Sequence, residues 1–261
     1  MDIFDHILSS RIIMFHGFYN LASQMICEKR NMNVIGNNIV NATTPGYKKD
    51  TFVATTFQEQ LVNRTQHSSK MSEQIGTTQM MRTGKVTTTD YAQGGFELTD
   101  EKFDFALGTS GFFQIQKPDG TVVYTRNGSF YMDDDGYLAL QGVGRVLGGN
   151  GEIYLGQDNI TADNHGNIYD TQGNFYGQIS IRDFDDYDSL LKNDNGTYTS
   201  SEEGIQKRGL IQWKALETSN VNPVIEMTMM MSGQRSLQSS AQMLKMYDQL
   251  MGKIVSDIGK L

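Results

Sequence analysis

Apolar residues recur every seven positions near the C-terminal end of the chain. The first row of this pattern is Met230, Leu237, Leu244, Met251 and Ile258, and a second row follows three residues later at Ser240, Tyr247, Ile254 and Leu261. This is the a and d spacing of a coiled-coil seam. Asn222 is a favourable N-cap, Pro223 suits the first helical position, and Glu226 lies near the positive end of the helix dipole. The pattern predicts a helix over residues 222–259, with a weak point in its seam at Gly233.

A shorter version of the same pattern occupies the N-terminal stretch. Its a positions are Phe18, Met25, Met32 and Ile39, and its d positions are Leu21, Ile35 and Ala42. Glu28 interrupts the d row. The helix is expected to end around Thr43, because a proline at position 45 forces the residue before it out of the helical region. Pro45-Gly46 suits a type II turn.

The two seams need apolar partners, because a long amphipathic helix is only marginally stable alone in water. The simplest partner for each seam is the other one, or the same helix of a neighbouring copy. The predicted assembly interface is Phe18, Leu21, Met25, Met32, Ile35, Ile39, Met230, Leu237, Leu244, Tyr247, Met251, Ile254 and Ile258.

Between the two helical ends the chain is dominated by glycine and short β-prone runs. Turn signals at Gly120, Gly128 and Gly136 separate four runs that predict a β-meander. These runs are Phe112–Gln116, Thr121–Arg126, Ser129–Asp133 and Tyr137–Gln141. Further Gly/Asn-rich turns continue to about residue 200, which favours a compact all-β domain.

The expected fold class is therefore α+β, with a discontinuous helical, coiled-coil domain from both termini and a mainly-β central domain. The expected parts are an N-terminal helix in 1–45, a polar extended connector in 46–95, the all-β domain in 96–214, and a C-terminal helix in 215–261 that pairs with 1–45.

Charge and composition narrow the classes of function. The formal net charge of −8 opposes the basic surface that nucleic-acid binding requires, so nucleic acid is not an expected partner. The lone cysteine, Cys27, lies in an apolar helical pattern and is expected to pack as a small hydrophobe. The first residues are acidic and no apolar run is long enough to cross a bilayer, so we expect neither a cleaved signal peptide nor membrane insertion.

The sequence offers no anchor for catalysis or metal binding. The four histidines lack metal-ligand spacing, and the acidic runs lack the calcium-loop pattern. The glycine run 142–149 is not followed by the Lys-Ser/Thr of a phosphate loop and is interpreted as β-turns. Gly108-Thr109-Ser110-Gly111 has the wrong spacing for a nucleophile elbow. We therefore expect no enzyme activity, no cofactor, no metal, no catalytic residue and no small-molecule substrate.

Three motifs resemble those of the flagellar basal-body rod protein family. The segment Asn37–Lys48, Asn-Asn-Ile-Val-Asn-Ala-Thr-Thr-Pro-Gly-Tyr-Lys, resembles the signature near the N-terminus of rod and hook proteins. The stretch from Asp104 to Phe130, with Tyr-Thr-Arg-Asn-Gly-Ser-Phe at its end, resembles the central β-domain motif. Glu217–Met227 resembles the segment that leads into the C-terminal helix. The matching signature positions are Asn37, Asn38, Asn41, Thr44, Pro45, Gly46, Tyr47, Ser219, Asn220, Val221, Pro223, Gln234 and Arg235.

The resemblance implies a structural subunit that is passed through the flagellar export apparatus without a cleaved signal peptide. It implies assembly with itself and with other axial proteins of rod and hook into a helical tube that transmits torque. Gln74-Ile75-Gly76-Thr77 and Ala92-Gln93-Gly94 are more similar to distal-rod than to proximal-rod members. Two alternatives stay open: a hook or hook-cap protein, and a secreted wall-acting enzyme, which would need a carboxylate pair in a cleft.

Overall fold

The chain forms two compact units in a computed structural model. The structure describes the backbone of residues 2–65, 72–193 and 195–258, and the side chains of 17–55, 87–193 and 195–256. The helical unit comprises Met1–Val40, Asp50–Asp90 and Asn222–Leu261, and the β unit comprises Asn41–Lys49 and Tyr91–Val221. Two long helices and a mainly-β region confirm the α+β class.

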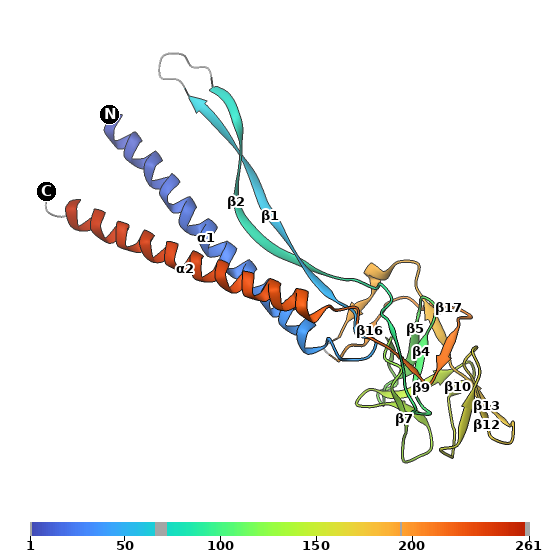
Figure 1. The fold of residues 1–261 in the computed structure, drawn as a ribbon. Coiled ribbons are helices and arrows are strands. Elements are labelled where there is room, and N and C mark those ends of the chain that lie inside the picture. Colours follow the sequence, from blue (N-terminus) through green and yellow to red (C-terminus); the bar gives the residue numbers. More distant parts are fainter. Residues whose placement is uncertain (1, 66–71, 194, 259–261) are drawn as a thin grey trace. The chain divides into compact units, whose positions relative to one another are not determined.

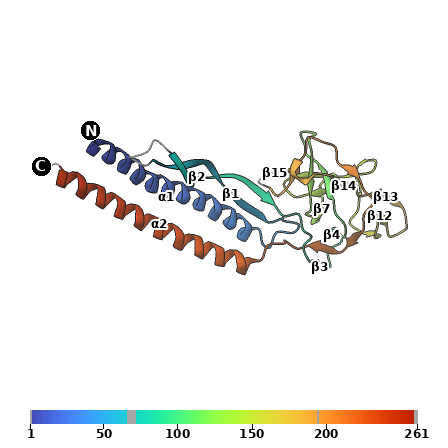
Figure 2. The ribbon, with the colours of Figure 1, turned by 90° about the horizontal axis from the view of Figure 1, so that it is seen from above.

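The helical unit contains α1 (Asp2–Val40) and α2 (Pro223–Ile258), which lie side by side in both ribbon views (Figures 1 and 2). They are antiparallel, because Gly36 lies opposite Met230 whereas Gly17 lies opposite Tyr247. The bounds of α2 agree with the prediction to within one residue at each end. Asn222 caps it as expected: its Oδ1 accepts hydrogen bonds from the backbone N–H groups of Val224 and Ile225 at 3.1 and 3.3 Å.

A long β-hairpin completes the helical unit, where the sequence analysis expected an extended connector. Strands β1 (Asp50–Thr65) and β2 (Ser72–Thr89) are antiparallel, with Asp50 opposite Thr89 and Thr65 opposite Ser72. The backbone is extended as expected, but the pairing was not foreseen. These strands are rich in Thr and Gln and lack the alternation of apolar and polar residues that signals a strand pair.

The β unit is built from short strands. Their bounds are β3 Phe96–Leu98, β4 Phe105–Leu107, β5 Phe112–Gln116, β6 Val122–Thr125, β7 Phe130–Met132, β8 Leu138–Leu140, β9 Gly144–Gly148, β10 Gly151–Glu152, β11 Ile160–Ala162, β12 Asn167–Asp170, β13 Phe175–Gln178, β14 Ile181–Asp183, β15 Leu191–Lys192, β16 Tyr198–Thr199, β17 Ile205–Gln206, β18 Ile211–Trp213 and β19 Ala215–Glu217. A short 3₁₀ helix spans Tyr187–Ser189. The largest sheet has the order β15-β16-β6-β5-β9-β8-β7, with β10 beside β9 and with β14 beside β5 and β17.

All four predicted strands exist, but the predicted meander is wrong. Strand β6 is not a neighbour of β7, because β9 lies between β5 and β8. Strand β9 comes from the glycine run that the sequence analysis interpreted as turns. Gly144 opens β9 where a side chain would collide with the carbonyl of Gln116, so glycine there allows the strand to approach β5 closely.

Two clusters of buried side chains hold the β unit together. The larger includes Phe113, Ile115, Val123, Leu138 and Val146 from the central strands. The smaller is aromatic and contains Phe112, Tyr124, Phe184, Leu190 and Tyr198.

Candidate assembly site

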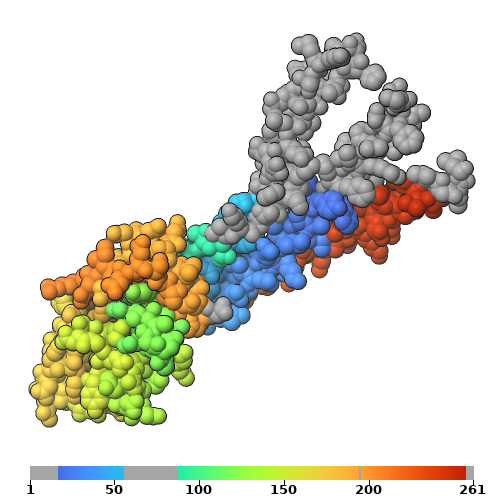
Figure 3. All heavy atoms as spheres, turned by 180° about the vertical axis from the view of Figure 1, so that it is seen from behind, coloured from blue at the N-terminus to red at the C-terminus, as the bar shows by residue number. Residues whose placement is uncertain are grey.

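The residues of α2 that are shielded from solvent follow the predicted heptads. The buried or half-buried positions of α2 are Glu226, Met230, Gly233, Ser236, Leu237, Ser240, Leu244, Tyr247 and Met251. All but Ser236 are spaced alternately by three and four residues, which is the period of a helix packed along a seam. Figure 3 shows the atoms of α1 and α2 in contact along much of their described length.

The predicted interface residues of α1 are shielded to different degrees. Ile35 is buried, and Leu21, Met25, Met32 and Ile39 are half-buried. Phe18 and, on α2, Ile254 are 43% and 40% exposed, and the side chain of Ile258 lies outside the described residues. Within one chain, then, most of the predicted interface residues are shielded from solvent. Their part in contacts between copies stays a prediction.

The two positions that interrupt the apolar rows, Gly233 on α2 and Glu28 on α1, face each other. Gly233 is buried, and a Cβ built on it would lie 2.8 Å from Oε1 of Glu28 and 3.2 Å from Cγ of Met32. A missing side chain on α2 therefore accommodates the long polar side chain that interrupts the row on α1. The seam is not left open at Gly233, because Glu28 and Met32 fill the space.

Gly233→Leu is expected to destabilise the helical unit by about 1–3 kcal/mol, because four added carbons have no space against Met32. The measurement is the loss of helical circular dichroism in urea. Gly252→Leu is the matched control, since nothing lies within 4 Å of the Cβ position at Gly252. Both variants gain the same helix propensity, so equal stability of the two would contradict this packing.

A buried polar pair lies at the start of α2. Asn38 donates from Nδ2 to Oε2 of Glu226 at 3.3 Å and to the carbonyl of Asp50 at 2.8 Å, and its Oδ1 accepts from the N–H of Asp50 at 3.0 Å. Asn38 and Glu226 are 0% and 1% exposed. A buried polar pair in an apolar seam favours one register over others. From the sequence, Glu226 is expected only to interact with the helix dipole, and its contact with Asn38 is not evident.

In the β unit, the Thr44–Tyr47 segment forms the predicted type II turn. The N–H of Tyr47 donates to the carbonyl of Thr44 at 3.3 Å, and Gly46 has φ +68°. The N–H of Gly46 donates to the carbonyl of Glu217 at 2.7 Å, and a Cβ on Gly46 would collide with the backbone of Arg126. Glycine is therefore required here both by conformation and by space.

Three buried charges lie beside this turn. Nζ of Lys48 is 2.5 Å from Oε1 of Glu217, and Nη1 of Arg126 is 3.2 Å from Oε2 of Glu217. Their side chains are 0%, 4% and 0% exposed in the order Lys48, Arg126, Glu217. The backbone N–H of Gly94 also donates to Oε1 of Glu217 at 3.0 Å, and Lys48 donates to the carbonyl of Ala92 at 2.7 Å. One carboxylate thus bridges two cations that are withdrawn from water.

Other signature residues stabilise the backbone near the Thr44–Tyr47 turn and just before the start of α2. Oδ1 of Asn220 accepts from the N–H of Lys49 at 2.7 Å, and Oγ of Ser219 accepts from the N–H of Val221 at 3.2 Å. Oδ1 of Asn41 accepts from the hydroxyl of Thr44 at 3.2 Å. Asn37, Gln234 and Arg235 are exposed on their helices.

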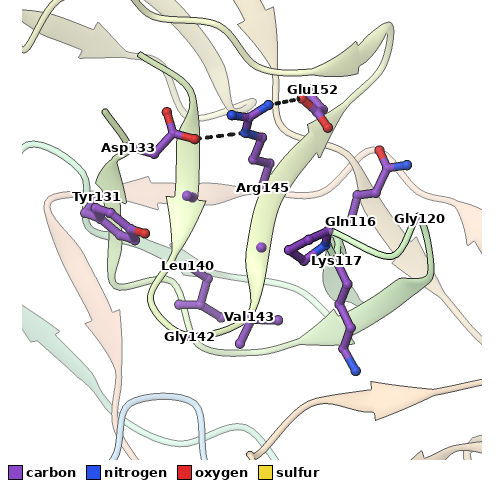
Figure 4. A pocket seen from close by; sticks show the side chains of 13 residues that line it. Gln116, Lys117, Gly120, Tyr131, Asp133, Leu140, Gly142, Val143, Arg145 and Glu152 are labelled. Atoms are coloured by element: carbon purple, nitrogen blue, oxygen red, sulfur yellow. Dashed lines mark hydrogen bonds and ion pairs between the residues drawn. The ribbon is translucent and has the colours of Figure 1, made fainter. Parts of the chain in front are cut away.

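A surface hollow of about 690 Å³ in the β unit is lined by several charged side chains (Figure 4). Arg145 points from β9 toward Asp133 and Glu152, at 2.8 and 3.1 Å, and also binds Asp135 at 2.5 Å. Burial alone would raise the pKa of Asp133, but the hydrogen bonds from Tyr137 and Arg145 outweigh it and lower the pKa. A glycoside hydrolase needs a carboxyl group with a raised pKa as its general acid, so Asp133 is unsuited to that part.

Within the residues that the structure describes, no group of three or more His, Cys, Asp and Glu side chains could hold a metal ion. Over the same residues, neither helix is both long and apolar enough to cross a membrane.

Three successive regions of the chain match models of flagellar protein families. Residues 18–48 match "Flagella basal body rod protein", 106–199 match "Flagellar hook protein FlgE/F/G D1 domain", and 214–257 match "Flagellar basal body rod FlgEFG protein C-terminal". The chain belongs to the flagellar basal-body rod protein family.

Rod proteins of several bacteria are similar over nearly the whole chain. The protein FlgG of Bacillus subtilis is 29% identical, with 93% of this chain and 99% of the relative covered. FlgG of Buchnera aphidicola subsp. Schizaphis graminum is 28% identical, covering 86% and 92%. FlgF of Caulobacter vibrioides is 27% identical, covering 95% and 100%. The chain is thus a structural rod protein.

The charged cluster of this rod protein takes one residue from each matched region. Lys48 lies in the first, Arg126 in the second and Glu217 in the third. In the sequence the three residues belong to three separate motifs, and no pattern signals that they meet. Their burial, which suggests a charged partner for each, becomes visible only in the structure.

Proposed function

We propose that this rod protein assembles with copies of itself through its helical unit, forming a tube that transmits torque from motor to hook. The observation that carries the proposal is the exposed apolar surface of α2. Val224, Met227, Met231, Leu250 and Val255 are between 52% and 73% exposed, although α2 already packs against α1. Several large apolar side chains left exposed along one helix favour a further protein interface.

The proposed mechanism couples helix stability to assembly. A pair of helices with one shared seam is marginally stable, and docking on further copies would bury the apolar side chains that are still exposed. In this proposal the free subunit stays loosely ordered at its ends, which suits passage through the flagellar export apparatus without a cleaved signal peptide. Its partners are then other axial proteins of rod and hook, with no nucleic acid and no small-molecule substrate.

We place the subunit in the distal rod. The support is the similarity of Gln74–Thr77 and Ala92–Gly94 to distal-rod members. Imaging basal bodies from a strain that lacks this protein tests the position: a rod truncated at its outer end is expected, and a complete rod with its hook would contradict the function itself.

A hook-type axial protein is the second candidate, favoured by the match of residues 106–199 to a domain of hook proteins. The same images separate the two candidates, because loss of a hook protein would leave a complete rod without a hook.

Leu244→Asp is expected to abolish rod assembly, because it places a charge in the half-buried seam at a cost of several kcal/mol. Trp213 fluorescence should still report a folded β unit. Gln249→Asp, an exposed position of α2, is the control that should assemble. Hydrogen exchange of the dilute monomer tests the coupling: protection of 18–42 and 224–258 equal to that in assembled rods would contradict it.

A further inference from the structure

A second row of residues on α2 has the same period as the seam but is exposed at every position except the half-buried Ser236. The row, called the second stripe here, consists of Ile225, Met229, Ser232, Ser236, Ser239, Met243, Met246 and Leu250. Successive members again alternate by three and four residues. At about 100° of rotation per residue, the second stripe lies roughly 100° around the helix from the seam.

The apolar members of the second stripe are strongly exposed. Ile225, Met229, Met243, Met246 and Leu250 are 45–59% exposed. Three serines occupy the middle of the stripe, and small residues let another backbone approach closely. A regular apolar row with a small-residue centre is the pattern of a helix that packs along a second partner.

Over the second half of α2, the opposite part of the exposed surface is polar. Its residues include Gln234, Arg235, Gln242, Lys245 and Gln249. The exposed apolar side chains in the second half of α2 therefore do not reflect a helix that is apolar all round. These apolar side chains mark one side of the helix as the candidate contact surface.

An apolar groove of about 490 Å³ lies on the other side of the seam. It runs between α1 and α2 and is lined by Met25, Ile26, Lys29, Leu237, Gln238 and Ala241. On α2, Gln238 and Ala241 are rotated away from the seam in the direction opposite to the second stripe. The helix pair thus carries an apolar ridge on one flank and an apolar groove on the other.

We propose that the second stripe of one copy packs into the groove between α1 and α2 of the next copy. This inference rests on the proposed function and names the surfaces that would carry it. Both surfaces adjoin the α1–α2 seam, so the new contact continues an interface that the structure already contains. Because the ridge and the groove are different surfaces, each copy keeps one of them free after docking, and the contact repeats without closing on a dimer.

The double variant Met243→Asp/Leu250→Asp is expected to lower the amount of assembled protein at least about tenfold. Two carboxylates buried in an apolar contact cost more than the 1.4 kcal/mol that corresponds to one decade of affinity. Both positions are exposed in the single chain, so the helicity of the monomer should match that of the parent. Gln242→Asp/Gln249→Asp is the matched control, with the same charge change on the polar part of the same turns, and should assemble normally.

The outcomes separate this inference from the proposed function. If deleting the protein removes the rod but the Met243→Asp/Leu250→Asp variant still builds it, the function stands and the ridge-and-groove contact is wrong. If deletion leaves the rod and hook intact, the proposed function fails.

Cross-linking tests the pairing of the two surfaces directly. In a Cys27→Ser background, Ile26→Cys places a thiol in the groove and Met246→Cys places one on the second stripe. A short bismaleimide should convert assembled protein with both thiols into a ladder of multimers. Met246→Cys alone should give no ladder and few dimers. Abundant dimers from Met246→Cys alone would show that stripes pack on stripes and would overturn the proposal. A ladder from the pair Ile26→Cys and Gln242→Cys as abundant as that from Ile26→Cys and Met246→Cys would also overturn it, because Gln242 lies on the polar part of α2.

Discussion

Replacing Glu217 with alanine is expected to lower the free energy of unfolding of the β unit by about 3–5 kcal/mol. The substitution leaves Lys48 and Arg126 buried without their carboxylate, and each cation keeps its full cost of desolvation. It also removes the acceptor of the Gly94 N–H. Urea unfolding followed by the fluorescence of Trp213 measures the change, because this lone tryptophan lies in β18.

Two further variants make the Glu217 result interpretable. Glu152→Ala removes a carboxylate from Arg145, whose side chain is 30% exposed, and an exposed ion pair is worth less than about 1 kcal/mol. Glu217→Gln keeps the size and part of the hydrogen bonding, so its effect should fall between the other two. A loss from Glu217→Ala no larger than that from Glu152→Ala would show that the buried cluster contributes little.

Gly46→Ala is expected to destabilise the β unit by about 2–4 kcal/mol. A non-glycine residue in the left-handed region costs about 1–2 kcal/mol, and the added Cβ also meets the backbone of Arg126. Gly120→Ala is the matched control, since Gly120 has φ +84° but open space around its Cβ position. The same Trp213 measurement applies. If the two variants lose equal stability, only the conformation of Gly46 matters and the close approach to Arg126 does not.

The elements that were predicted correctly have strong local signals. Residues Asn222 and Pro223 mark the start of α2, and its heptads mark the side that packs on α1. Likewise Pro45-Gly46 specifies a turn by itself, and the glycines at 120, 128 and 136 separate strands that all exist. In each case the determining interactions lie within a few residues of one another in sequence.

The features that were missed leave no clear local signal in the sequence. Gly144 enters the sheet beside β5 because two backbones must approach closely, and nothing near Gly144 in the sequence shows this. The pairing of β1 with β2 follows from backbone hydrogen bonds between polar strands. The second stripe was overlooked for a different reason: its central serines hide the heptad when only apolar residues are counted.

The residues that form the buried polar contacts lie far apart in sequence, and this determines how late in synthesis the contacts can form. Asn38 and Glu226 are 188 residues apart, and Lys48 and Glu217 are 169 apart. During synthesis from the N-terminus, neither pair can form until more than four-fifths of the 261 residues have been made. Such long loops close slowly. The nascent chain therefore exposes the partner surface of α1 for most of its synthesis, and a binding protein that covers this helix would have that whole interval in which to act.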